Sequence, residues 1–206
     1  MLDYFYQGGP VMYPLLFCSL VSLTIIIERG LFWIREKRRR DKKRLDTFMD
    51  LIAENNLTRA KELAENTTDY VMRVMVCGTV HREFSLRDAL QMSADEEIAR
   101  MRKYLPVLDT MITLSPLLGI LGTVIGIIYS FQMLGTVGVE HPRMITGGIA
   151  QALITTAFGL IIAIFSLIPY NYYISKIEKA SLEIEQYGTN LEIIFEKNKN
   201  GEKRAE

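Results

Sequence analysis

The sequence is poor in the residue types that build many enzyme and metal sites. It contains two histidines and two cysteines in 206 residues. Cys18 lies in an apolar stretch and Cys77 in a charged one, so we expect no disulfide between them. With no cluster of cysteine and histidine, nothing indicates a metal site or a cofactor. We also find no nucleophile paired with a base and no phosphate-binding glycine loop, so we do not expect an enzyme.

Charge is absent from three long stretches. No Asp, Glu, Lys or Arg occurs in residues 4–27, 110–139 or 144–175, although the chain has 24 acidic and 24 basic residues. About 20 apolar helical residues suffice to cross the hydrocarbon core of a bilayer. The sequence therefore predicts an all-α membrane protein with three transmembrane helices and long helices that extend into a helical domain outside the membrane.

Basic residues follow the first stretch, whereas residues 1–27 contain neither Lys nor Arg. The positive-inside rule places this basic end in the cytoplasm and the N-terminus outside. A basic run can alternatively bind nucleic acid, but its position against the membrane favours a topology signal, so we expect no nucleic-acid partner. The residues assigned to topology are Arg35, Lys37, Arg38, Arg39 and Arg40.

The expected order follows from these runs. It is a periplasmic N-terminus with the first span (1–34), a cytoplasmic helical insert (35–106), a second span (107–134), a short periplasmic loop (135–144), a third span (145–173) and a cytoplasmic amphipathic helix with a tail (174–206). Glu28 and Arg29 lie late in the first span. Either both side chains reach the cytoplasmic headgroups, or they form a functional ion pair inside the membrane.

The insert shows helical periodicity. An apolar stripe at helical spacing predicts a buried face, at Leu45, Phe48, Met49 and Ile52. Ser85 with Asp88 has the pattern of a helix start. We expect this helix to continue through Tyr104 into the second span, with Pro106 kinking it without ending it.

Small and hydroxyl-bearing residues mark the second and third spans. Gly119, Gly122 and Gly126 share one helix face, and Thr123 lies beside it. The third span carries Gly148, Gln151, Thr155, Thr156 and Gly159. Small residues allow helices to approach closely, so these two spans predict a packed interface with polar groups along it.

The middle of this interface contains no ionisable side chain. Proton relays inside membranes use such groups. If protons cross here, this chain supplies a polar wall, and a single-span partner with an intramembrane Asp or Glu supplies the titrating group. A purely structural bundle would also have no charge at this place. Asp109, at the cytoplasmic entrance of the second span, lies either at a water-filled mouth or at the headgroup level.

Two stretches resemble the signature sequences of the MotA/TolQ/ExbB proton-channel family. They are Pro-Leu-Leu-Gly-Ile-Leu-Gly-Thr-Val-Ile-Gly at 116–126 and Gly-Ile-Ala-Gln-Ala-Leu-Ile-Thr-Thr-Ala-Phe-Gly-Leu at 148–160. The resemblance, closest to ExbB and TolQ, extends to the order of spans and the length of the insert. It implies a homopentamer in the bacterial inner membrane whose second and third helices surround a pore.

The same resemblance implies partners and roles. The pore would hold the helices of an ExbD- or TolR-like dimer whose Asp carries the proton, and force would reach outer-membrane clients through a TonB- or TolA-like protein. Thr123 and Thr156 match the pore-facing threonines, and Pro116 matches the proline of the second span. An ExbB-like role in energising outer-membrane transport comes first, a TolQ-like role in envelope integrity second, and a non-conducting membrane scaffold remains a third alternative.

Two positions depart from the family pattern. Gln151 stands where the family often has Glu, and an amide can form hydrogen bonds but cannot titrate. Asp109 stands where a small neutral residue is expected. We hypothesise that it compensates as an acid near the cytoplasmic exit of the proton path.

Overall fold

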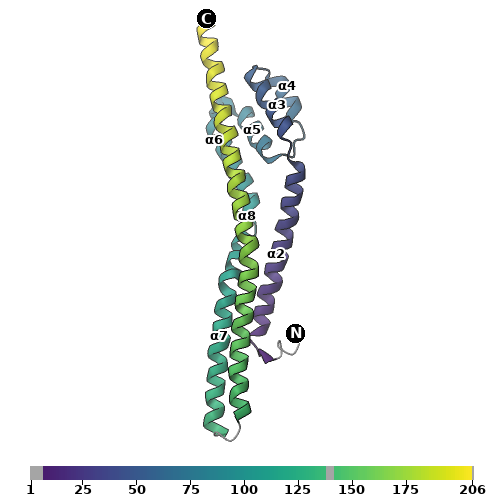
Figure 1. The fold of residues 1–206 in the computed structure, drawn as a ribbon. Helices are drawn as coiled ribbons and strands as arrows, with labels where there is room; N and C mark the ends of the chain where they lie inside the picture. Colours follow the sequence, from purple (N-terminus) through teal and green to yellow (C-terminus); the bar gives the residue numbers. More distant parts are fainter. Residues whose placement is uncertain (1–6, 138–141, 206) are drawn as a thin grey trace. The chain divides into compact units, whose positions relative to one another are not determined.

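The computed structural model describes residues 7–137 and 142–205, so the expected loop at 135–144 lies partly outside the described residues. The described part is helical, with no strand, and is drawn in Figure 1. Its helices are α2 (Met12–Arg39), α3 (Lys42–Ala53), α4 (Leu57–Ala64), α5 (Tyr70–Val80), α6 (Arg82–Arg102), α7 (Leu105–Val137) and α8 (Pro142–Ala205). The chain divides into two compact units, each described separately below.

Unit 1 contains residues up to Arg29 and Tyr104–Tyr173, and hence the start of α2, all of α7 and the first half of α8. In this unit Val11, Met12 and Leu15 form a buried cluster, against which side chains of α7 and α8 pack, namely Leu118, Phe158 and Ile162.

Three helices of the described chain, α2, α7 and α8, are long and apolar enough to cross a membrane. In the most apolar 18-residue stretch of each helix, only 28% (α2), 22% (α7) and 28% (α8) of the residues are buried. A soluble protein rarely leaves so much apolar surface open to water. The prediction of an all-α protein with three spanning helices is therefore confirmed.

Unit 2 contains Gly30–Lys103 and the chain from Ile174 onward. The predicted stripe on α3 is confirmed, since all four of its side chains are buried. On the second half of α8, the buried apolar residues repeat every seven positions, at Ile177, Ile184 and Leu191. That repeat keeps one face of the helix on the core of unit 2.

The start of the long helix in the insert is confirmed, but its predicted continuation into the second span is wrong. Ser85 has an extended backbone, and its Oγ accepts a hydrogen bond from Asp88 N at 3.2 Å, as a helix cap does. The helix ends at Arg102, and Tyr104 adopts a left-handed conformation with φ of 68°.

Proline explains the break. Pro106 has no N–H to donate, and within a continuous helix its ring would collide with the carbonyl of Arg102. In the first turn of a new helix neither difficulty arises. The carbonyl of Tyr104 accepts the first bond of α7, from Leu108 N at 3.2 Å, so Pro106 starts α7 rather than bending α6.

Candidate functional site: the seam between α7 and α8

Glycines bring the backbones of α7 and α8 into direct contact. A Cβ added to Gly126 would lie 2.7 Å from Gly148 O, and one added to Gly148 would lie 2.9 Å from Gly126 O. A Cβ added to Gly159 would lie 2.5 Å from the carbonyl oxygen of Ser115. These distances are too short for a methyl group, so the two helices can pack in this way only because the side chains are missing. We call this contact, which also includes Gly119 and Gly122, the seam.

The seam brings two threonine hydroxyls together. Thr156 Oγ1 donates to Gly119 O on the facing helix at 2.9 Å and lies 3.5 Å from Thr123 Oγ1. Thr123 Oγ1 donates to Ile120 O on its own helix at 2.6 Å. Each hydroxyl has one proton and two lone pairs, and both protons are engaged by carbonyl groups. The lone pairs are what this pair can offer to a further donor, such as water or a protonated carboxyl group.

The other hydroxyls of the seam are packed inside it. Thr155 is fully buried and lies against Gly122, and its Oγ1 donates to Ala152 O at 2.9 Å. Ser130 is buried and donates to Gly126 O at 3.0 Å. Such bonds to the preceding turn satisfy a hydroxyl within apolar surroundings. The surroundings of Thr155 are thus those of a packing residue, and its place in a proton path stays a prediction.

Gln151 lies at the N-terminal side of the seam, half-buried against the lead-in to α2. A Cβ on Gly9 would fall 2.8 Å from the amide carbon of Gln151, so the side chain covers the Gly9 backbone. Gly9 has a φ of 69°, a conformation that glycine adopts without strain. The amide therefore packs on a backbone turn that no larger residue would form easily.

Asp109 is not close to the hydroxyl pair. It is exposed on α7, 14 residues before Thr123, which is about 21 Å along a helix axis at 1.5 Å per residue. Pro116 lies between them inside α7 and removes one bond from the helix ladder. The structure thus separates the predicted acid from the predicted hydroxyls by four helical turns.

Glu28 and Arg29 form an ion pair, with Arg29 Nε 2.5 Å from Glu28 Oε2. The Arg29 side chain is only 3% exposed, whereas that of Glu28 is 44% exposed. The guanidinium lies 5.5 Å from the ring centroid of Tyr104, at the break before α7. Arg29 is therefore directed into unit 1 and does not reach outward to headgroups.

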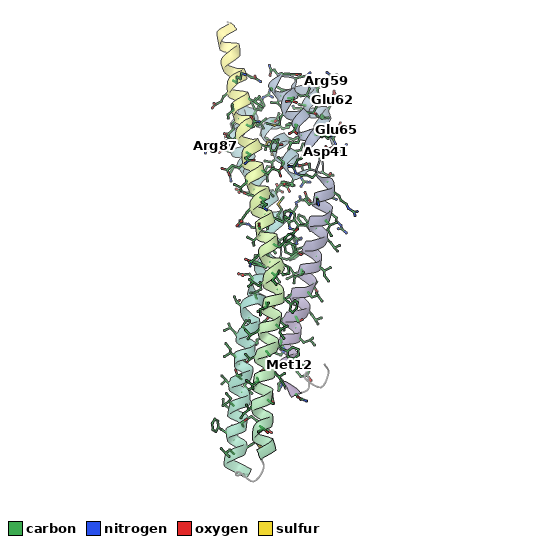
Figure 2. All side chains as sticks on the ribbon, viewed as in Figure 1. Met12, Asp41, Arg59, Glu62, Glu65 and Arg87 are labelled. Carbon is green, nitrogen blue, oxygen red and sulfur yellow. The ribbon has the colours of Figure 1, made fainter. Side chains whose placement is uncertain are left out.

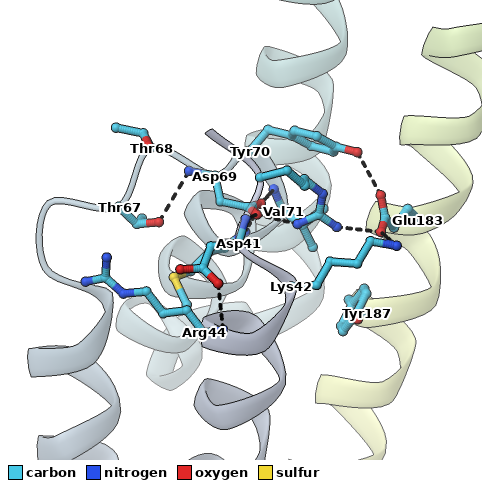
Figure 3. A network of polar contacts seen from close by, with 12 residues as sticks. Asp41, Lys42, Arg44, Thr67, Thr68, Asp69, Tyr70, Val71, Glu183 and Tyr187 are labelled. Carbon is cyan, nitrogen blue, oxygen red and sulfur yellow. Dashed lines mark hydrogen bonds and ion pairs between the residues drawn. The ribbon is translucent and has the colours of Figure 1, made fainter. Parts of the chain in front are cut away.

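The basic run after the first apolar stretch divides into two groups in unit 2. Arg35, Lys37, Arg38 and Arg39 are exposed. Arg40 instead turns inward and pairs with Asp69 and with Glu183. Figure 3 labels these two carboxylates, and Glu183 lies on α8.

Sequence reasoning missed this network, in which Tyr70 Oη also donates to Glu183 Oε2 at 2.8 Å. Burial and the hydrogen bond to the carboxylate both raise the pKa of Tyr70. Burial acts to raise the pKa of Glu183, but the hydrogen bonds from Tyr70 and Arg40 outweigh it and hold that pKa below its ordinary value. No local signal pointed to this network, because Glu36, four residues before Arg40, pairs instead with Arg100 on α6.

Comparison with known proteins shows the family of this chain. Residues 39–186 match the model of the MotA/TolQ/ExbB proton channel family, and the chain belongs to this family. It is 38% identical over 202 residues to a biopolymer transport protein called ExbB-like 1 from a Synechocystis species, covering 95% of this chain and 79% of the relative. It is 30% identical over 165 residues to biopolymer transport protein exbB1 of Vibrio cholerae, covering 77% and 72% of the two chains.

A shorter similarity involves the Tol-Pal system protein TolQ of Haemophilus influenzae. The identity is 37% over 83 residues, or 40% of this chain and 36% of that protein. The resemblance inferred from residues 116–126 and 148–160 is thus confirmed at the level of the family. Relatives named ExbB and relatives named TolQ both match, and the chain is a membrane protein of this proton-channel family.

Proposed function

We propose that this chain is the proton-channel subunit of an inner-membrane motor that energises outer-membrane transport, in the manner of ExbB. The observation that carries the proposal is the pair formed by Thr123 and Thr156, with 3.5 Å between the hydroxyl oxygens. The pair lies on a helix contact built by glycine, within two apolar stretches free of charged residues.

The chemistry of the pair limits its role. Threonine hydroxyls exchange hydrogen bonds but hold no charge near neutral pH, so they can solvate a proton carrier without being one. In our proposal an ExbD- or TolR-like dimer provides the carrier, an intramembrane Asp, inside a homopentamer of this chain. A TonB- or TolA-like protein then receives the force. The N-terminus is periplasmic and the basic end of α2 cytoplasmic, with the six segments predicted above.

The test is proton uptake by vesicles that contain this chain together with an ExbD-like partner. Thr156→Val removes the hydroxyl and keeps the shape. Losing one hydrogen bond of about 1.4 kcal/mol in the rate-limiting step slows transfer roughly tenfold. The matched control is Thr24→Val, because Thr24 is exposed on α2 and donates to Leu20 O at 2.7 Å. Equal rates for both variants and the wild type would remove the hydroxyl pair from the mechanism.

Further arms of the same assay test the remaining assignments. If Asp109→Asn leaves proton-driven uptake intact, the idea that this acid compensates for Gln151 fails. A complex that assembles but conducts no protons with any partner supports the scaffold alternative. Similarity to TolQ keeps the envelope-integrity role as a second candidate. Co-purification with a TolR-like rather than an ExbD-like protein would favour it.

A further inference from the structure

The end of α2 presents a row of cations on its outer surface. Arg35, Lys37, Arg38 and Arg39 are exposed, and we call them the outward basic face. Glu36, between them, is 3% exposed and faces the interior of unit 2. The helix thus turns its carboxylate inward and four positive charges outward, so the face has no acidic side chain of its own.

This face continues an apolar surface on the same helix. Leu31 and Ile34 are 49% and 54% exposed. Arg35 follows Leu31 by four residues, and Arg38 follows Ile34 by four, so each arginine lies one turn beyond an exposed apolar residue. One turn is about 5.4 Å. Along α2, exposed apolar side chains are therefore replaced within one turn by exposed cations.

That order matches a phospholipid, in which a short glycerol segment joins the acyl chains to a charged phosphate. We propose that the outward basic face binds the headgroups of anionic phospholipids in the membrane that α2 crosses. The planar guanidinium group forms two parallel hydrogen bonds to a phosphate, which suits three arginines in five residues. The inference is independent of proton conduction, since it concerns the outer surface of α2 and not the seam.

Two arginines that follow this face in the sequence, Arg40 and Arg44, are engaged elsewhere. Arg40 pairs with Asp69 and Glu183. Arg44 Nε donates to Leu63 O at 2.7 Å. The nearby carboxylate of Asp41 accepts from Arg44 N at 3.1 Å, as the cap of α3. The protein therefore satisfies the inward cations with its own acceptors and leaves the outward four to solvent or to lipid.

A natural reporter lies within this turn of helix. Trp33 is the single tryptophan of the chain. We would reconstitute the full chain in vesicles of brominated phosphatidylglycerol diluted into phosphatidylcholine, and in vesicles with the bromine on the other lipid. Quenching of Trp33 by each lipid gives their relative occupancy near the helix. We expect phosphatidylglycerol to be preferred by about fivefold or more at low salt, with the preference falling as salt screens the charges.

Matched variants test whether the lipid preference depends on the outward basic face or on the net charge of the protein. Arg35→Gln/Arg38→Gln/Arg39→Gln should bring the preference close to one. The control Arg59→Gln/Lys61→Gln/Arg87→Gln removes the same charge from exposed positions of unit 2 outside the outward basic face, and should keep the preference (Arg59 and Arg87 are labelled in Figure 2). Arg35→Lys/Arg38→Lys/Arg39→Lys should retain most of it, because the charge remains.

The wild-type protein alone can overturn the proposal. Equal quenching by the two brominated lipids, at low salt, would show that α2 does not select anionic headgroups. Loss of the preference in both glutamine variants would assign it to net charge rather than to this face. Tighter binding of a soluble polyanion, such as an oligonucleotide, with no lipid preference, would identify a different partner and refute the lipid assignment.

Discussion

Asp69 is a buried carboxylate in unit 2 that is contacted by three backbone N–H groups and by Arg40. It is 2% exposed and accepts hydrogen bonds from Val71 N at 2.9 Å and Met72 N at 3.4 Å, as the cap of α5. It also accepts from Asp41 N at 2.9 Å (Figure 3). It pairs with Arg40 as well. We predict that Asp69→Ala destabilises α5 and the chain around it far more than the loss of an ordinary helix cap.

The magnitude follows from two losses. Removing a helix cap costs about 1 kcal/mol. Removing one partner of a buried ion pair costs about 3 to 5 kcal/mol. The lower end applies here, because Arg40, whose side chain is 12% exposed, keeps its contact of 2.5 Å with Glu183. The sum is about 4 kcal/mol, close to a thousandfold in the opening equilibrium, since about 1.4 kcal/mol corresponds to tenfold.

The assay is hydrogen–deuterium exchange of the α5 amides in the full chain, held in detergent. Asp41→Ala is the control, since Asp41 is exposed and its side chain accepts a hydrogen bond from Arg44 N as the cap of α3. It should speed local exchange only about fivefold, the equivalent of about 1 kcal/mol. Asp69→Asn, which keeps an acceptor for the cap but loses the charge, should fall between the two. If Asp69→Ala and Asp41→Ala have equal effects, the buried ion pair does not stabilise unit 2 as argued.

Two further predictions concern the packing of the seam and the pH dependence of the stability of unit 2. Gly148→Leu places a side chain against Gly126 O and should lower the thermal unfolding temperature strongly, with overpacking of about 3 kcal/mol or more. Gly147→Leu, with nothing within 4 Å, should change it little, and equal shifts would contradict backbone contact at the seam. Burial acts to raise the pKa of Glu183, but its hydrogen bonds outweigh burial and keep the pKa low in the folded protein. The contribution of Glu183 to folding stability is therefore present above the ordinary carboxyl pKa of about 4.3 and is lost as pH falls through the lower folded pKa. Because burial and hydrogen bonding raise the pKa of Tyr70, its contribution is full below about pH 10 and is lost as pH rises through the folded value. The free energy of unfolding of unit 2, measured with denaturant, should therefore show a plateau near neutral pH. Glu183→Gln should reduce the loss of this free energy at acid pH. If stability falls at acid pH as much in that variant as in the wild type, titratable groups other than Glu183 cause the fall.

Local patterns were readable from the sequence where neighbours along the chain decide the structure. The stripe of α3 and the cap at Ser85 depend on residues three or four positions apart. The same holds for the glycine faces, since their periodicity identifies a close-packing surface before the partner helix is known. The family resemblance rested on these same stretches, which explains why it was specific.

The break at Tyr104 was missed because Pro106 was expected to kink the helix without ending it. The residue before a proline avoids helical conformation, which makes a boundary near Leu105 the simpler expectation. The position of Arg40 could not be read from the run of cations, because its partners Asp69 and Glu183 are 29 and 143 residues away in the sequence. Likewise, the short distance from Thr123 to Thr156 depends on how α7 and α8 align along their glycine faces. The residue pattern of either helix alone does not predict that alignment.

The mutual contact of Gly126 and Gly148 has a genetic consequence. Every missense change of a glycine codon adds at least a Cβ, and at either position that atom meets the carbonyl oxygen of the other glycine. Glycine is already the smallest residue, so neither position can become smaller to make room for a larger residue at the other. A second substitution at the partner position therefore cannot compensate for the first. The pair should behave in a saturation mutagenesis screen as two positions with no permissive path between them, whereas Gly147, one codon away, should accept many replacements.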